Sequence, residues 1–168
     1  MNLRNAQVFA ISLRAGSTAI IVNMAMLAVA DKFGLVTARG GLLKLATNFL
    51  VAQMSQYGEA QAASWLIDFT RTPVFQAAFH FAVGLLMSVV FMKFAGAYLK
   101  RYAWSAGLIA AIFVWIINAA VILPLLGEGI AGSHAISPAC IAYFAVTHTV
   151  FFILLSLNAR RRLIAESP

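Results

Sequence analysis

The side chains best suited to acid–base or ligand chemistry are histidines, and two of the three lie inside long apolar runs. His80 and His148 each stand in a run long enough to form a membrane-spanning helix, whereas His134 lies in a glycine-rich link. Histidine relays protons near neutral pH and ligates metals and haem iron. Asn23 and Asn118 place a polar amide in each of the other two apolar runs. The sequence therefore offers His80, His148, Asn23 and Asn118 as a polar layer that could hold a ligand or move protons.

The depths of these four residues can be compared once each run is treated as a helix. At ~1.5 Å per residue, Asn23, His80 and Asn118 lie roughly 10 Å below the outer surface and His148 roughly 16 Å below it. Because unpaired polar groups in hydrocarbon are costly, we expect these groups to face one another. They would then serve as hydrogen-bonded links between helices, or as a path for protons or a small polar solute. Haem held between His80 and His148, or a bound quinone, is a further alternative.

No pattern typical of a catalytic site is present in the sequence. It has no Ser/His/Asp arrangement, no paired carboxylates within the apolar runs and no glycine-rich phosphate loop after a strand. The single cysteine, Cys140, allows neither an internal disulfide nor a cysteine-based metal site. We therefore expect a protein that is not an enzyme, with no resident metal.

The composition indicates that much of this chain is solvated by lipid. Of its 168 residues, 62% are hydrophobic and only 10% are charged, whereas soluble domains are nearer half apolar and a quarter charged. The formal net charge is +7. The basic residues stand at the ends of apolar runs, so a membrane surface explains them better than nucleic acid.

The apolar runs predict an all-α membrane protein with a single domain over residues 1–168. Four transmembrane helices in a bundle are expected at about 7–30, 73–98, 102–123 and 137–158, since a span needs about 20 apolar residues. The first outer connection contains a segment at about 41–69 with helical apolar spacing but pieces too short to span. We expect one or two amphipathic helices there, lying at the membrane interface.

Small residues recur at intervals of four in two of the predicted spans. Gly84 and Ser88 follow His80 in one, and Gly107 and Ala111 form a pair in the next. Such faces let a neighbouring helix approach closely. We therefore expect a non-enzymatic structural or accessory component, which packs through these faces with copies of itself or with another membrane protein.

The basic residues also predict the orientation. Arg160, Arg161 and Arg162 follow the fourth span, and Lys100 and Arg101 lie between the second and third. With four crossings all of these fall on the side of both termini. Because cytoplasmic connections are enriched in Lys and Arg, we expect a multi-pass protein of the bacterial inner membrane with both termini in the cytoplasm. Membrane lipids are then its first partners.

The second half of the chain combines its apolar runs with a particular set of residues. It includes His80 and Gly84 in one span, the run Pro124-Leu125-Leu126-Gly127 at the end of the next, and His148 ahead of the closing arginine cluster. In these features about Phe75 to Arg162 resembles the YagU-like small inner-membrane proteins. The resemblance implies a small bacterial inner-membrane protein with a link to acid tolerance. Phe144 stands where that pattern leads us to expect an acidic residue, one turn before His148, which argues against a carboxylate–imidazole relay.

Overall fold

The computed structural model describes residues 3–35 and 40–166, and within these ranges it contains helices and turns but no strand. The all-α class predicted from the sequence is therefore confirmed. The long helices are α1 (Leu3–Lys32), α2 (Gly41–Gln56), α3 (Ala60–Arg71), α4 (Pro73–Ala95), α5 (Leu99–Ile117) and α7 (Pro138–Ala165). The short elements are the 3₁₀ turns η1 (Gly96–Tyr98) and η3 (Ile130–Gly132), the π-helical η2 (Asn118–Ile122) and α6 (Leu123–Leu125).

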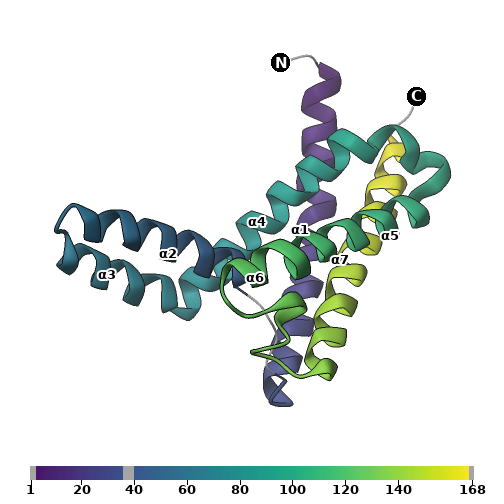
Figure 1. Cartoon of the computed structure of the whole chain (residues 1–168). Helices are drawn as coiled ribbons and strands as arrows, with labels where there is room; N and C mark the ends of the chain where they lie inside the picture. Colours follow the sequence, from purple (N-terminus) through teal and green to yellow (C-terminus); the bar gives the residue numbers. More distant parts are fainter. Residues whose placement is uncertain (1–2, 36–39, 167–168) are drawn as a thin grey trace.

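Three helical stretches in the described part of the chain are long and apolar enough to cross a membrane, namely Ala6–Lys32, Pro73–Leu125 and Pro138–Ala165. The second contains 53 residues, which at ~1.5 Å per residue far exceeds the ~30 Å of a bilayer core. This stretch folds back on itself in Figure 1, because η1 separates α4 from α5 and Tyr102, in the first turn of α5, has a non-helical backbone (φ −125°, ψ 38°). The helices predicted at 73–98 and 102–123 correspond to its two limbs.

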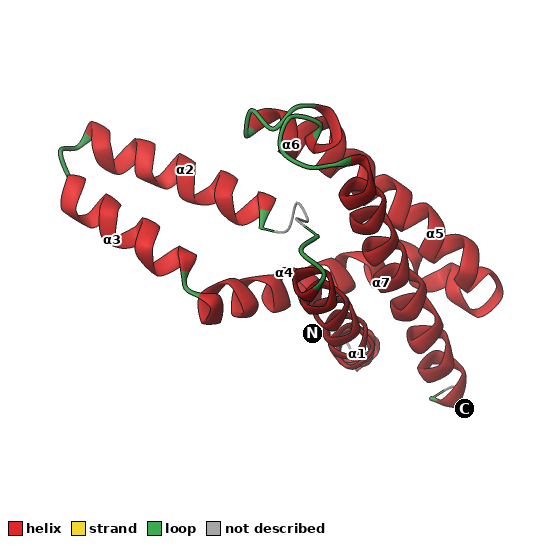
Figure 2. Cartoon of the chain, turned by 90° about the horizontal axis from the view of Figure 1, so that it is seen from below, coloured by secondary structure: helices red, strands yellow, loops and turns green. Residues whose placement is uncertain are grey.

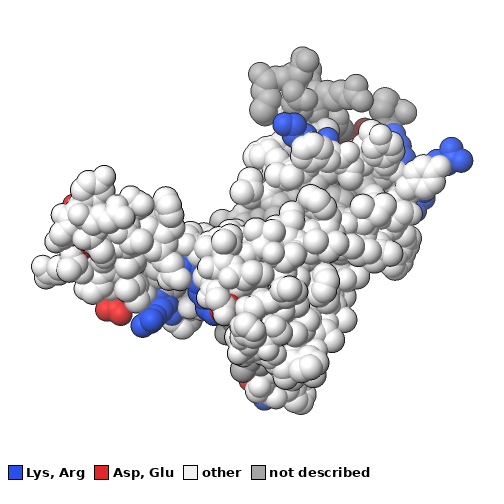
Figure 3. Space-filling view, viewed as in Figure 1, with Lys and Arg blue, Asp and Glu red and all other residues white. Residues whose placement is uncertain are grey.

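Most charged side chains lie near the ends of these helices or on the α2–α3 hairpin and at its base. The space-filling view shows Lys and Arg near the chain ends and again beside the projecting hairpin, with an uncharged band between them (Figure 3). Such a band is what a lipid-facing surface requires, because a charge at the bilayer centre is costly.

Hydroxyl–proline pairs start two of the long helices. Thr72 Oγ1 accepts a hydrogen bond from Phe75 N at 3.3 Å, and Ser137 Oγ accepts one from Cys140 N at the same distance. A proline follows each cap, at the first helical position, where its missing N–H has no helical partner to lose.

The helices α1 and α7 lie at the centre of the packing. Helix α1 packs against α4 and α7, and α7 also packs against α5, whereas α4 and α5 have few contacts with each other. The spatial order is thus α4, α1, α7, α5, so the two halves of the molecule meet along α1 and α7. The largest buried cluster lies here and includes Ile11, Phe91, Phe152 and Leu155.

Helices α1 and α4 pack antiparallel through small residues. A Cβ added to Gly84 would lie 2.5 Å from Ile20 Cδ1, and one added to Gly16 would overlap the Ser88 hydroxyl. Ser88 is fully buried, and its Oγ donates to Gly84 O at 2.7 Å. The face predicted from Gly84 and Ser88 is therefore occupied by α1, within the same chain.

The second small-residue face packs against α7. A Cβ on Gly107 would lie 2.7 Å from Ser156 Oγ and 2.8 Å from Phe152 O, so the two backbones are close together. Ala111 belongs to the same buried cluster as Phe152. Both small-residue faces thus pack inside the chain and are not open to another subunit.

The segment predicted to lie at the interface forms a helical hairpin, α2–α3, which projects sideways from the other long helices (Figures 1 and 2). Gly41 packs near Ile122 and Leu123 at its base, and Lys44 Nζ forms a salt bridge with Glu128 at 2.9 Å. An aromatic series connects α3 to α4, with ring centroids 5.1 Å apart for Trp65–Phe69, 4.7 Å for Phe69–Phe75 and 6.2 Å for Phe75–Phe79.

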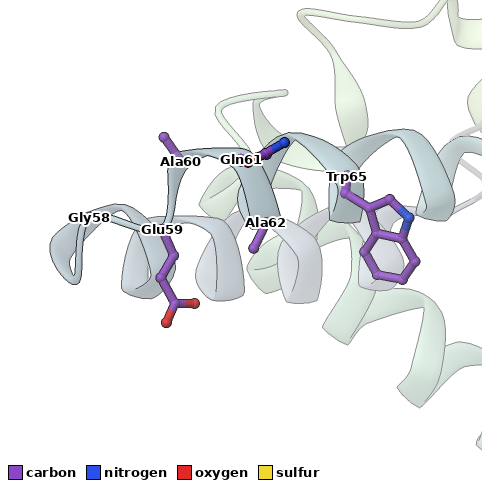
Figure 4. Close-up of a pocket in the computed structure, with 6 residues that line it drawn as sticks. All are labelled: Gly58, Glu59, Ala60, Gln61, Ala62 and Trp65. Carbon is purple, nitrogen blue, oxygen red and sulfur yellow. The ribbon is translucent and has the colours of Figure 1, made fainter.

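The tip of this hairpin has a shallow surface hollow lined by Gly58, Glu59, Ala60, Gln61, Ala62 and Trp65. Glu59 and Trp65 point to one side of the ribbon and Gln61 to the other (Figure 4). The polar groups therefore do not converge on a common point, and the hollow has no arrangement that would orient a ligand.

The close approach at Gly107 predicts that Gly107→Ala destabilises the protein by about 1–3 kcal/mol, because the added methyl meets backbone that cannot rotate away. The free energy of unfolding in detergent micelles measures this change. Gly96→Ala is the matched control, since its Cβ would meet only Met92 Cε, at 3.7 Å. Equal stability of the two variants would contradict the packing of α5 against α7.

Candidate functional site

The clearest polar site is the side chain of Asn23, which lies between three helices. Asn23 is only 4% exposed. Its Nδ2 donates to the backbone carbonyl of Thr147 on α7 at 2.9 Å, and its Oδ1 lies 2.9 Å from His80 Nε2 on α4. One carboxamide therefore joins α1, α4 and α7.

The partners of Asn23 determine which atoms carry protons. A backbone carbonyl only accepts hydrogen bonds, so the amide nitrogen of Asn23 must face Thr147 O and its oxygen must face His80. The Nε2 atom of His80 must then carry a hydrogen and donate it. The half-buried His80 ring is thus held in an orientation that keeps Nε2–H toward the interior.

The contact between Asn23 and His80 continues the small-residue packing of the same two helices. Gly16 lies opposite Ser88, Ile20 opposite Gly84 and Asn23 opposite His80. The intervals of three or four on each helix keep all of these residues on one face. His80, Gly84 and Ser88 therefore form a single surface of α4 that packs against α1, and its polar end, His80, contacts Asn23.

A second hydrogen bond connects α1 and α7 one turn from Asn23. The hydroxyl of Tyr143 donates to Met26 O at 2.7 Å. The bonded residue on α1 advances from Asn23 to Met26, while its partner on α7 moves back from Thr147 to Tyr143. The two bonds therefore fix an antiparallel register between α1 and α7.

The other two members of the predicted polar layer bond within their own helices. Asn118 Nδ2 donates to Val114 O at 3.1 Å, and His148 Nδ1 lies 2.9 Å from Phe144 O. The Phe144 ring contacts the His148 ring edge-on, with centroids 4.3 Å apart. The structure brings Asn23 and His80 together but gives Asn118 and His148 separate partners.

Two residues that form these interhelical hydrogen bonds were not predicted from the sequence. Thr147 contributes a backbone carbonyl, which any residue at that position would provide, so no side-chain pattern marks it. Tyr143 could have been recognised, because it lies four residues before Thr147 on the same face of a predicted span and its hydroxyl needs a partner there.

The chemistry that this arrangement supports is hydrogen bonding between helices. Among residues 3–35 and 40–166 there is no group of three or more His, Cys, Asp or Glu side chains that could hold a metal ion. Haem between His80 and His148 stays an alternative from the sequence, to which the described contacts add no support.

Replacing Asn23 with leucine tests this site, because it removes two interhelical hydrogen bonds at constant shape. At about 0.6–2 kcal/mol per bond in a membrane interior, we expect the loss of two bonds to lower the unfolding free energy by about 1–4 kcal/mol. Asn118→Leu is the matched control, since its amide bonds within its own helix. Adding His80→Leu to Asn23→Leu should cost little more, and full additivity in this double-mutant cycle would contradict the pairing.

The chain matches no known protein family, and it shows no significant similarity to a curated protein or to a solved structure. The resemblance of its second half to the YagU-like proteins therefore stays a prediction. Its function has to be inferred from its own contacts and charges.

Proposed function

We propose that this chain is a non-enzymatic integral protein of the bacterial inner membrane that crosses the bilayer four times and acts as a structural or accessory component. The proposal rests on the hydrogen bonds that the polar side chains form. Inside the apolar helices they bond to one another or to helix carbonyls, and the Asn23 amide does so across three helices. These groups are used to hold the helices together.

Four crossings are supported by the arrangement of the chain reversals. Both chain ends and the α4–α5 turn lie toward the upper part of Figure 1, whereas the end of α1, the start of α4 and the loop before α7 lie lower. The 23 residues of α4 extend about 35 Å, which is enough for one crossing. Helix α5 continues through η2 and α6 for a comparable length.

The charges support cytoplasmic termini. The chain has five acidic residues, and only Glu166 lies near the chain ends and the α4–α5 turn. Asp31, Glu59, Asp68 and Glu128 belong to the other end. The described basic residues near the chain ends and the α4–α5 turn are Arg14, Lys93, Lys100, Arg101, Arg160, Arg161 and Arg162. Such an excess of positive charge belongs on the cytoplasmic side.

A partner subunit would bind the outer surface of α4 and α5. The small-residue faces are already used, whereas large apolar side chains on this surface are exposed, including Leu86, Phe94, Ile109 and Phe113. We propose that copies of the chain or another membrane protein pack here, and that lipid covers what remains. The α2–α3 hairpin then lies along the outer interface, with Trp65 at headgroup level.

Single cysteines test the crossings and the orientation. In a Cys140→Ala background, we expect Ser55→Cys and Ser133→Cys to react with a membrane-impermeant maleimide in cells with a permeable outer membrane. Ala97→Cys, in the α4–α5 turn, should react only after the inner membrane is opened. Labelling of Ala97→Cys and Ser133→Cys from the same side would contradict the four-crossing arrangement.

The same background tests assembly. Ile109→Cys lies on the outer surface of α5, so a bifunctional maleimide should join it to a second polypeptide in native membranes. Cysteine at the buried Ala111 is the control and should remain unlinked. A monomeric product for both positions would contradict the accessory role.

A further inference from the structure

We propose that the corner formed by Lys100, Arg101 and Arg160 binds the phosphate of an anionic phospholipid. The inference rests on the proposed membrane location and adds a ligand to it. Lys100 and Arg101 lie at the start of α5, and Arg160 lies near the end of α7, 60 residues along the chain from Lys100. The fold brings these three residues to one corner of the molecule.

Arg160 is held at this corner by a hydrogen bond. Its Nε donates to Lys100 O at 3.2 Å. A guanidinium has five N–H groups in one plane, and its geometry matches the oxygens of a phosphate. The bond from Nε–H orients the side chain, and the two terminal nitrogens carry the other four N–H groups, the kind of donor that binds a phosphate.

Arg101 is also held in place. Its guanidinium carbon lies 5.2 Å from the centroid of the Tyr102 ring, which is a cation–π distance. Tyr102 is the residue at which the helix geometry breaks, so the ring and the guanidinium project from a turn. The side chains of Lys100, Arg101 and Arg160 are all exposed.

The charge around this corner favours an anion. Glu166 is the acidic residue at this end of the molecule, and its Oε2 accepts a hydrogen bond from Gln7 Nε2 at 3.1 Å. The other four acidic residues belong to the opposite end of the bundle or to the hairpin. Clusters of basic residues at the cytoplasmic end of spanning helices are typical binding sites for anionic lipid headgroups.

The residues next to the corner favour a lipid over a free phosphate. Tyr98 and Trp104 are 63% and 64% exposed, and exposed Tyr and Trp mark the headgroup level of a membrane protein. Leu108 and Ile112 follow Trp104 at intervals of four and are also exposed, so the three lie on one face of α5. A headgroup at the cations would have its acyl chains along this apolar face.

Native mass spectrometry of the whole protein in mild detergent tests the site, with phosphatidylglycerol and phosphatidylcholine of matched chains as probes. We expect the natural protein to prefer phosphatidylglycerol. The triple variant Lys100→Gln, Arg101→Gln and Arg160→Gln should bind it roughly a hundredfold more weakly, at roughly fivefold per charge. Inorganic phosphate should not displace the bound lipid.

The control removes three charges at the other end, as Lys32→Gln, Lys44→Gln and Arg71→Gln, and should retain the preference. Equal losses in both triple variants, or no preference for phosphatidylglycerol, would overturn the proposal. Displacement by inorganic phosphate would show a simple anion site and overturn it as well. If the first triple variant fails to fold, Arg101→Gln alone and Arg160→Lys, which keeps the charge but loses the fork, replace it and should each weaken binding.

Failure of this proposal can be separated from failure of the proposed function. The lipid measurement uses purified protein and does not depend on its orientation in cells. Labelling of Ala97→Cys from the outside with an intact lipid preference would refute the orientation only. The expected labelling pattern without a lipid preference would refute the lipid site only.

Discussion

The Asn23 carboxamide is the interaction on which the rest of the structure depends. A polar amide inside an apolar bundle must find partners, because leaving it unpaired is costly. It finds one partner on α4 and another on α7, at 2.9 Å in each case. The bond to His80 places Ile20 against Gly84 and Gly16 against Ser88, and the bond to Thr147 places Met26 beside Tyr143. The directional bonds set the register, and close packing of small residues provides the contact area.

The position of α5 follows from this arrangement. Helix α5 has few contacts with α4 and is held mainly by α7, through the close approach at Gly107. Its far side therefore exposes Trp104, Leu108, Ile112 and other apolar residues. The α4–α5 turn lies beside the end of α7, which brings Arg160 to Lys100. One packing order thus creates both an apolar outer surface and a basic corner at its edge, beside the α4–α5 turn.

Much of this fold was predictable from the sequence, because its main determinants are local. Apolar runs identified the long helices, helical spacing identified one or two helices in the segment that forms α2 and α3, and intervals of four identified the face with Gly84 and Ser88. The partner of that face was not predictable, since α1, α5 and α7 could all have met it. Asn118 and His148 were expected to face the other polar groups, but each bonds to a carbonyl one turn earlier in its own helix. A backbone acceptor is available at every position of a helix, so the sequence cannot show which polar side chain will use one.

The most direct test of this account is solid-state NMR of the protein in lipid bilayers, with ¹⁵N-labelled histidine and ¹³C-labelled asparagine. The account predicts that His80 carries its hydrogen on Nε2 and that this N–H shows a through-space correlation with the side-chain carbonyl carbon of Asn23. The correlation should be absent in Asn23→Leu. A His80 ring without this correlation in the natural protein, with Nε2–H exchanging freely with water, would show that α1 and α4 are not joined in this way and would contradict the account.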